Sequence, residues 1–327
     1  MASKRARGKR EKKVKKKEKK PKVKDVQVEE GFREKKTRKL SVLARMNPKH
    51  MVVYPLIVFF IAILLLAVHP PNLGIDLKGG VVVTAYNVNA NPSDLASYIK
   101  EKTGLSVHVE KFKSITGMAG VRIYASAKAD AAVIENAIKE KYPNARVVSS
   151  QVSPTFGKVA QRQGIRAVLF AFIGMAIVVF LFFRNPISSG AIIFSALSDM
   201  TIALAVMGLV GIKLTTATIA ALLMLIGYTV DSNILLTTRL TKRKEDTIED
   251  AYLYAVSTGF TMSTTTLAAL TVLYFVSTSS VIDNIAAVLI FGLLADFMNT
   301  WIFNAGVLRW YLSRPNRMFF KGKAGRA

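Results

Sequence analysis

The stretch that decides the fold runs from Met51 to Val68 and reads MVVYPLIVFFIAILLLAV. It contains no charged residue, and as a helix it would extend about 27 Å, close to the thickness of a bilayer core. His69-Pro70-Pro71 follows it, where a signal peptide would carry small residues for cleavage. We therefore expect this stretch to be an uncleaved transmembrane helix.

Five further apolar segments begin after a long polar gap and then follow one another closely. Short charged or turn-forming stretches separate them, such as Arg184-Asn185-Pro186 and Gly211-Ile212-Lys213. The sequence therefore predicts an α-helical integral membrane protein with six transmembrane helices. The five segments cover about residues 165–183, 187–210, 216–238, 255–276 and 284–308.

Positive charge is concentrated towards the N-terminus. The chain has 46 Lys+Arg against 21 Asp+Glu, a formal net charge of +25, and residues 1–50 are too polar to fold alone. Loops on the side of this tail carry several Arg and Lys, whereas the opposite loops between spans carry only Lys213. By the positive-inside rule, both termini are predicted to be cytoplasmic.

The predicted organisation has five parts. They are a basic, disordered cytoplasmic tail (1–50), transmembrane helix 1 (51–68), an extracytoplasmic domain (69–164), transmembrane helices 2–6 (165–308) and a basic cytoplasmic C-terminus (309–327).

The extracytoplasmic domain is predicted to be α+β. Gly79-Gly80 precedes a β-rich run at 81–86, and a helix is expected from the capping residue Asn91 to Gly104. Alternating patterns at 105–110 and 121–125, a helix over about 128–142 and a strand beginning at Val147 complete the domain. This β-α-β-β-α-β order predicts a ferredoxin-like fold, which we interpret as a binding or docking module.

Several classes of chemistry are excluded or disfavoured by residue content. The chain has no cysteine, which excludes disulfides and thiolate metal sites, and its three histidines (His50, His69 and His108) are too far apart to suggest a catalytic zinc. Gly74-Ile75-Asp76-Leu77-Lys78-Gly79-Gly80 lacks the G-K-[ST] ending of a P-loop. We therefore expect no enzyme activity, no catalytic residue, no cofactor and no metal.

Three aspartates, Asp199, Asp231 and Asp296, lie within the predicted spans. A carboxylate at a helix centre costs about 2.5–3.5 kcal/mol on insertion scales, so these residues need an explanation. Arg239 is the nearest basic residue to Asp231, about 12 Å further along the same helix. Burial without a nearby cation favours the protonated carboxyl, which would allow proton exchange, although each Asp could instead only hydrogen-bond across helices.

Other polar and small residues accompany the aspartates. Gly227 lies four residues before Asp231, and we interpret it as a helix-packing residue. The Thr-rich fifth span could line a polar path, but hydroxyls of this kind more often bond to their own helix. The other polar residues near the three aspartates are Ser195, Ser198, Thr229, Ser232, Asn233, Asn299 and Thr300.

Four motifs, in their order and spacing over about residues 50–312, resemble the SecD/SecF family of protein-export membrane proteins in the resistance-nodulation-division superfamily. The length favours the SecF branch in its archaeal form over the longer SecD. The segment 74–80 resembles the G-x-D-[FL]-x-G-G element of that family, and Ser153-Pro154-Thr155-Phe156-Gly157 resembles its approach to the second span, with Ser in place of a Gly. The other two are the fourth-span segment from Ile226 to Arg239 and the sixth-span segment from Phe291 to Trp301.

The resemblance implies an accessory subunit that acts with a SecD-like subunit beside a SecYEG-type channel. Such a subunit would use the proton-motive force to help move translocating polypeptides across the cytoplasmic membrane. By position, Asp231 and Arg239 match the fourth-span polar sites, and Asp76, Gly79 and Gly80 match the base of the outside domain. Asp199 and Asp296 join the predicted proton relay on burial alone. The family has an acid just before the arginine, whereas Thr238 precedes Arg239 here.

Other functions remain open at this stage. The chain could belong to a small-molecule or lipid exporter of the same superfamily, although those exporters usually duplicate the six-span unit in one chain. It could also be a non-transporting membrane scaffold. The basic tail would bind anionic lipid, at about 1 kcal/mol per residue, or contact the ribosome. The coupling ion could be H⁺ or Na⁺.

Overall fold

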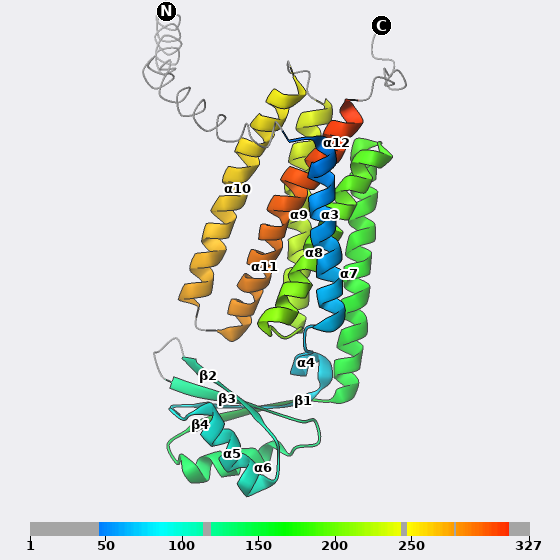
Figure 1. The fold of residues 1–327 in the computed structure, drawn as a ribbon. Helices are drawn as coiled ribbons and strands as arrows, with labels where there is room; N and C mark the ends of the chain where they lie inside the picture. The colour runs from blue at the N-terminus through cyan, green and yellow to red at the C-terminus, as the bar shows by residue number, and fades with distance from the viewer. Residues whose placement is uncertain (1–45, 114–118, 243–246, 278, 314–327) are drawn as a thin grey trace, which may run out of the picture. The chain divides into compact units, whose positions relative to one another are not determined.

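The computed structural model describes residues 46–113, 119–242, 247–277 and 279–313, and Figure 1 shows their arrangement. The predicted basic tail up to residue 45 and the C-terminus from residue 314 lie outside the described residues. Expectations about their order, lipid binding and ribosome contact therefore stay predictions.

Six long helical segments form a bundle, and each is long and apolar enough to cross a membrane. This confirms the predicted number of spans and their order along the chain. The last span changes from α-helix to π-helix and back to α-helix within its length. The spans are α3 (Pro48–Val68), α7 (Pro154–Phe183), α8 (Pro186–Val210), α9 (Thr216–Lys242), α10 (Ile248–Val276), and α11 (Ser280–Met298) continued by η1 (Asn299–Asn304) and α12 (Ala305–Leu312).

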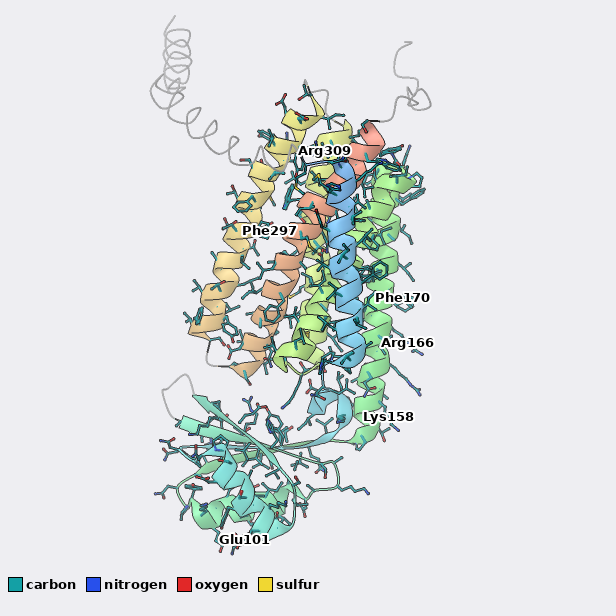
Figure 2. All side chains as sticks on the ribbon, viewed as in Figure 1. Glu101, Lys158, Arg166, Phe170, Phe297 and Arg309 are labelled. Carbon is teal, nitrogen blue, oxygen red and sulfur yellow. The ribbon has the colours of Figure 1, made fainter. Side chains whose placement is uncertain are left out.

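The helix that contains the second predicted span is longer than its apolar segment, because α7 begins at Pro154, before residue 165. Ser153 caps the helix by accepting a bond from the Phe156 N–H at 3.2 Å, and Pro154 suits the first turn. Hydropathy marks only the part of a helix that is apolar, so it missed these polar first turns. Figure 2 shows Lys158 and Arg166 projecting from this part of α7 and Phe170 from the turn that follows.

The domain between the first two spans is a four-stranded antiparallel sheet with two helices (Figure 1). The strand order is β2-β3-β1-β4, which is the order of the ferredoxin-like fold and confirms the prediction. Its elements are β1 (Gly80–Tyr86), α5 (Pro92–Thr103), β2 (His108–Lys113), β3 (Ala119–Ala125), α6 (Ala131–Lys141) and β4 (Arg146–Val152).

The core of this domain lies between the sheet and its two helices. Val83 pairs with Ile123 across β1 and β3, and both pack in one cluster with Leu95 of α5 and Ile134 of α6. Strand β2 begins three residues later than the alternating pattern, because Gly104 ends α5 in a left-handed conformation (φ 70°) and the next residues connect the two elements. The apolar residues Val109, Val121 and Ile123 of the alternating patterns are buried in this core.

Candidate functional site

Two of the three predicted intramembrane acids come together in the middle of the bundle. The side chains of Asp199 in α8 and Asp296 in α11 are 0% and 1% exposed, and two consecutive residues of the sixth span, Asn299 and Thr300, donate to them. None of the ion pairs among the described residues includes either of them. Charge compensation for these carboxyls must therefore come from something other than a paired side chain.

Asp296 is surrounded by hydroxyl groups. Ser232 of α9 lies with its Oγ 2.8 Å from Oδ2 and 3.0 Å from Oδ1 of Asp296, and Thr300 Oγ1 donates to Oδ1 at 2.5 Å. The two hydroxyls are themselves 3.3 Å apart. This arrangement stabilises a carboxyl group at a fixed position without a positive side chain.

Asp199 is held by an amide. Asn299 Nδ2 donates to Asp199 Oδ1 at 2.6 Å and to Ser198 Oγ at 2.9 Å. Within the part of the chain that the structure describes, Asp199 Oδ2 and Asn299 Oδ1 are buried and have no hydrogen-bond partner. The group is therefore incompletely satisfied, which is unusual for buried polar atoms.

The π-helix η1 explains how the sixth span supplies both sets of contacts. Asn299 and Thr300 are consecutive, yet Asn299 reaches α8 while Thr300 contacts Asp296 and lies beside Ser232 of α9. A π-helical turn is wider than an α-helical turn and is frequent at functional sites. Trp301 packs on Gly259 of α10, and Tyr252 OH donates to the Trp301 carbonyl at 2.8 Å. Both contacts fix η1 against α10.

Polar contacts continue from this group towards the far end of the bundle. Asn304 Nδ2 donates to Asn233 Oδ1 at 2.7 Å, and Asn233 Nδ2 donates to the Thr229 carbonyl at 2.7 Å. Arg309 follows on α12, and Figure 2 shows it at the end of the bundle opposite the sheet domain. These hydrogen bonds thus join η1 to α9 beyond the two aspartates.

We call Asp199, Asp296, Ser232, Asn299 and Thr300 the core polar group.

Asp231 does not join the core polar group. It is adjacent to Ser232 in sequence, but a rotation of about 100° per residue turns it away, and its side chain is exposed on α9. Met224, Gly227 and Tyr228 share this exposed face, and a Cβ built on Gly227 would meet nothing within 4 Å. The expected packing at Gly227 therefore concerns a surface that no described residue covers. We call these four residues the α9 outer face.

Arg239 lies two turns further along α9. Its guanidinium carbon is 4.5 Å from the centre of the Tyr254 ring, and its buried Nη1 has no hydrogen-bond partner among the described residues. This agrees with the sequence, in which Thr238 stands where the family has an acid before the arginine. Neither Asp231 nor Arg239 contacts Asp199 or Asp296 through any hydrogen bond found in the described residues.

The hydroxyls of the fifth span bond to their own helix. Thr258, Thr261 and Thr265 of α10 each donate to the carbonyl four residues earlier, at 2.8–3.1 Å. They line a shallow outer surface of α10 and not the core polar group. These bonds therefore satisfy the three hydroxyls within α10 itself.

The predicted base of the outside domain is a close junction. Asp76 lies in the short helix α4 (Ile75–Lys78), and its Oδ2 accepts from the Thr216 N–H at 3.0 Å, at the first turn of α9. Gly79 has φ 78°, and a Cβ there would lie 2.7 Å from Pro154 Cα. A Cβ on Gly80 would lie 2.8 Å from the Ala125 carbonyl oxygen. Both glycines are required by close backbone approach.

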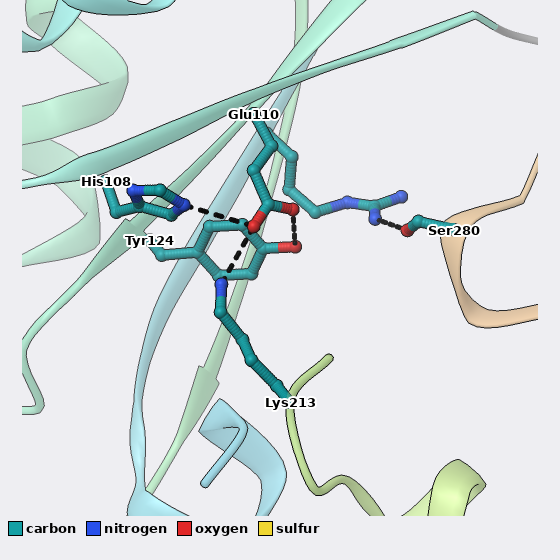
Figure 3. A network of polar contacts seen from close by, with 6 residues as sticks. His108, Glu110, Tyr124, Lys213 and Ser280 are labelled. Atoms are coloured by element: carbon teal, nitrogen blue, oxygen red, sulfur yellow. Dashed lines mark hydrogen bonds and ion pairs between the residues drawn. The ribbon is translucent and has the colours of Figure 1, made fainter. Parts of the chain in front are cut away.

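A second junction lies at the edge of the sheet. Figure 3 shows Glu110 and Tyr124, on β2 and β3, facing Lys213 of the loop between α8 and α9. Glu110 Oε1 accepts from Lys213 Nζ at 2.8 Å and Oε2 accepts from Tyr124 OH at 3.0 Å. Arg122 of β3 also donates to Ser280 Oγ at the start of α11.

Electrostatics favour this junction at neutral pH. Partial burial tends to raise the pKa of Glu110, but the hydrogen bond and charge of Lys213, helped by Tyr124 and His108, outweigh it and lower the pKa below the ordinary 4.5. A lowered pKa means that the stabilisation is present above the ordinary value and is lost as the pH falls through the lowered one. Burial also raises the pKa of the Tyr124 hydroxyl, which keeps it a donor.

We expect Lys213→Ala to loosen the outside domain from the bundle. A half-exposed ion pair contributes up to about 1 kcal/mol, so amide exchange in β2 and in the α8–α9 loop should rise about twofold to fivefold. Hydrogen exchange of the whole chain measures this, and Glu110→Gln should behave alike. Lys111→Ala removes the same charge from an exposed neighbour and should leave exchange unchanged; an equal rise there would contradict the junction.

Some of these residues carried little signal in the sequence. Lys213 was recognised only as a charge in an outside loop, and Glu110 only as a polar residue in an alternating strand. Asn304 was missed because it lies five residues after Asn299, a spacing that an α-helix does not place on one face. Tyr252 was missed because it is a single aromatic residue on another span, α10. Among the described residues, no group of three or more His, Cys, Asp or Glu side chains could hold a metal ion.

Comparisons with known proteins agree with the motifs. The family described as "Protein export membrane protein SecD/SecF, C-terminal" matches residues 133–314, and "SecD/SecF GG Motif" matches residues 64–85. The protein-export membrane protein SecF of Thermococcus gammatolerans is 68% identical over 90% of this chain and 95% of its own length. That of Pyrococcus furiosus is 56% identical over 84% of this chain and 95% of its own length.

The fold also has a solved counterpart. The crystal structure of SecDF, a translocon-associated membrane protein from Thermus thermophilus, is similar with a TM-score of 0.67 and 20% identity. The similarity covers 81% of this chain and 38% of the SecDF chain, so this chain spans about two fifths of that protein. The family matches and the archaeal relatives show that this chain belongs to the SecD/SecF family of protein-export membrane proteins, in its SecF branch.

Proposed function

We propose that the chain is an accessory subunit of the Sec protein-translocation machinery, which acts with a SecD-like subunit to promote polypeptide export and is driven by an ion gradient. The observation that carries the ion-driven part is the core polar group, in which two buried carboxyls lack a positive side chain. Family membership favours polypeptide export over small-molecule or lipid export.

The energetic scale supports an ion-driven role. Two carboxylates at this depth cost about 5–7 kcal/mol together on insertion scales, which binding of a cation or proton would reduce. One elementary charge that crosses about 100 mV gains about 2.3 kcal/mol, which is enough to shift a two-state protein by more than tenfold. Binding and release at Asp199 and Asp296 could therefore do mechanical work.

The contacts indicate how this work could reach the outside domain. Ser232, next to Asp296, lies on α9, and the first turn of α9 is capped by Asp76 at the base of that domain. The loop before α9 carries Lys213, which holds Glu110 on the sheet. A shift of α9 when the ion binds would therefore move both junctions together.

The α9 outer face supports a membrane partner. An exposed aspartate on a membrane-facing surface is costly unless another protein covers it, and Gly227 beside Asp231 would let a second helix approach closely. We propose that a SecD-like subunit covers this face and brings an acid to Arg239. The SecDF chain is longer than the part that this chain matches, which leaves room for such a second half.

The remaining partners and the location are proposals on the same basis. From the charge asymmetry of the loops we propose that the protein lies in the cell membrane, with both termini cytoplasmic and the sheet domain outside. A SecYEG-type channel and the translocating polypeptide would then lie beside the outside domain. A proton relay through Asp231, Arg239, Asp199 and Asp296 remains our proposal for the ion path.

Crosslinking tests the partner surface. The chain has no cysteine, so Met224→Cys introduces a unique thiol on the α9 outer face, where Met224 is 48% exposed. We expect it to crosslink to a co-expressed SecD-like subunit, because that face is proposed to be covered. Val178→Cys on α7, which is 62% exposed, is the control. Crosslinking of Val178→Cys alone would show that the partner binds elsewhere.

Export from proteoliposomes tests the function itself. Vesicles that hold the channel, this chain and a SecD-like subunit should export a polypeptide faster when an ion gradient is applied than when it is dissipated. An equal rate in both conditions would leave a passive scaffold as the better description.

A further inference from the structure

Two buried oxygen atoms of the core polar group need a donor that no described residue supplies. They are Asp199 Oδ2 and Asn299 Oδ1. They belong to the two groups that the 2.6 Å bond from Asn299 Nδ2 to Asp199 Oδ1 already joins. Both side chains are 0% exposed, and a buried acceptor left without a donor is costly.

The amide of Asn299 uses both N–H groups, one to Asp199 Oδ1 and one to Ser198 Oγ. If Asp199 were ionised, either orientation of the amide would leave its carbonyl oxygen facing a carboxylate oxygen, and neither of these atoms can donate. A protonated Asp199 removes this conflict in either orientation.

One proton would satisfy both atoms. A protonated carboxyl group has an O–H donor, and a carboxylic acid pairs with a primary amide through two parallel hydrogen bonds. The N–H···O bond of such a pair is present at Asp199 and Asn299. The second bond would run from Oδ2–H to the amide oxygen, and these are the two atoms that lack partners.

We propose that Asp199 is protonated in this state and that Asn299 is the positioning residue that holds the proton, by accepting a hydrogen bond from Asp199 Oδ2–H through its Oδ1. This proposal rests on the ion-driven function above and specifies the ion bound at this site as H⁺. A bare metal cation would instead need several oxygen ligands in a shell.

Release of the proton would couple to the shape of η1. Without it, Asp199 Oδ2 and Asn299 Oδ1 are both acceptors and repel each other, so the two side chains must move apart. Asn299 is the first residue of η1, and the next residue, Thr300, donates to Asp296. Movement at Asn299 would therefore also change the contacts of the second carboxyl.

The elements packed against α8 carry few other titratable groups near Asp199. Asp296 of α11 belongs to the same core polar group, and η1 carries no titratable side chain. Those of the other elements packed against α8 lie near helix ends, on outer faces or at the α12 end of the bundle. They are Lys49, His50 and Tyr54 of α3, Lys158, Arg162 and Arg166 of α7, Tyr228, Asp231, Arg239 and Lys242 of α9, Asp283 of α11, and Arg309 and Tyr311 of α12.

Infrared spectroscopy of the chain in membranes with its SecD-like partner tests the proposal. The background variant Asp296→Asn removes the other carboxyl of the core polar group. We expect a protonated-carboxyl band at neutral pH, insensitive to added Na⁺, that disappears when Asp199→Asn is added. Asn299→Leu should reduce the protonated fraction at alkaline pH about tenfold, the effect of one hydrogen bond. Asn299→Gln, which keeps the amide, should restore part of it.

Two outcomes would overturn the proposal. A band that survives Asp199→Asn would belong to another group, and a band that Na⁺ removes would show a metal-cation site instead. The same band measured with the natural Asp296 present guards against misfolding of the variants. If the band is absent while the gradient still speeds export, the proposed proton on Asp199 is refuted but the proposed function is not. If the band is present while the gradient has no effect on export, the proposed function is refuted.

Discussion

Asp296→Asn is expected to reduce the gradient-driven increase in polypeptide export at least tenfold, to about the rate without a gradient. The asparagine side chain has nearly the same shape and can still bond to Ser232 and Thr300, so the bundle should fold. It cannot bind or release a proton, however, and it carries no charge to attract a cation. Export rates from proteoliposomes with and without the gradient measure the effect.

Two further variants define what this result means. Asp94→Asn removes an exposed carboxyl from the outside domain and should leave the stimulation intact. Asp231→Asn should keep the fold and the association with the partner while it also removes the stimulation, because Asp231 is proposed to face the other half of the ion path. Full stimulation in Asp296→Asn would show that Asp296 acts only as a structural hydrogen-bond acceptor.

Gly259→Val is expected to produce the largest loss of stability. A Cβ at Gly259 would lie 2.0 Å from Cζ2 and 2.2 Å from Cη2 of the Trp301 ring, and Trp301 is almost fully buried. Overpacking of this kind costs about 1–3 kcal/mol or more. Because Trp301 is part of η1, the substitution should also displace Asn299 and Thr300. Thermal unfolding in detergent, followed by size-exclusion chromatography, measures the change.

Gly174→Val is the matched control for this loss. Gly174 lies on an exposed face of α7, and a Cβ there would meet nothing within 4 Å. The same substitution should therefore leave the unfolding temperature within the range of the natural chain. Equal stability of the two variants would show that Trp301 does not depend on the space at Gly259.

Much of the fold could be predicted from the sequence, because its signals are local. Six apolar segments gave the six spans, and the alternating patterns with Asn91, Gly104 and Pro143 gave the ferredoxin-like order. The polar first turns of α7, before residue 165, were not predicted, since they depend on a cap at Ser153 rather than on hydropathy. The close junction at Gly79 could be expected from the motif, but its partner Pro154 could not.

The site was only partly predictable, because helix orientation in a membrane is weakly encoded. Asp199, Asp296, Ser232, Asn299 and Thr300 could all be recognised as polar residues in costly places. Whether they meet depends on which faces of α8, α9 and α11 turn inward. Because each of these helices carries apolar residues on all of its faces, hydropathy does not show which face is inward. The resemblance emphasised Asp231, whereas the structure buries its neighbour Ser232 instead. The π-helical turn that aligns Asn299 with Thr300 has no signal in the sequence.

Proton entry during export is the most direct test of the central idea, that buried carboxyls of this chain bind and release the driving ion. A pH-sensitive dye trapped in proteoliposomes with the channel and the SecD-like subunit would record it. We predict that proton entry accompanies polypeptide export and ceases in Asp199→Asn and in Asp296→Asn, but continues in Asp94→Asn. Export that keeps its gradient dependence and its proton entry in both buried-carboxyl variants would contradict the account.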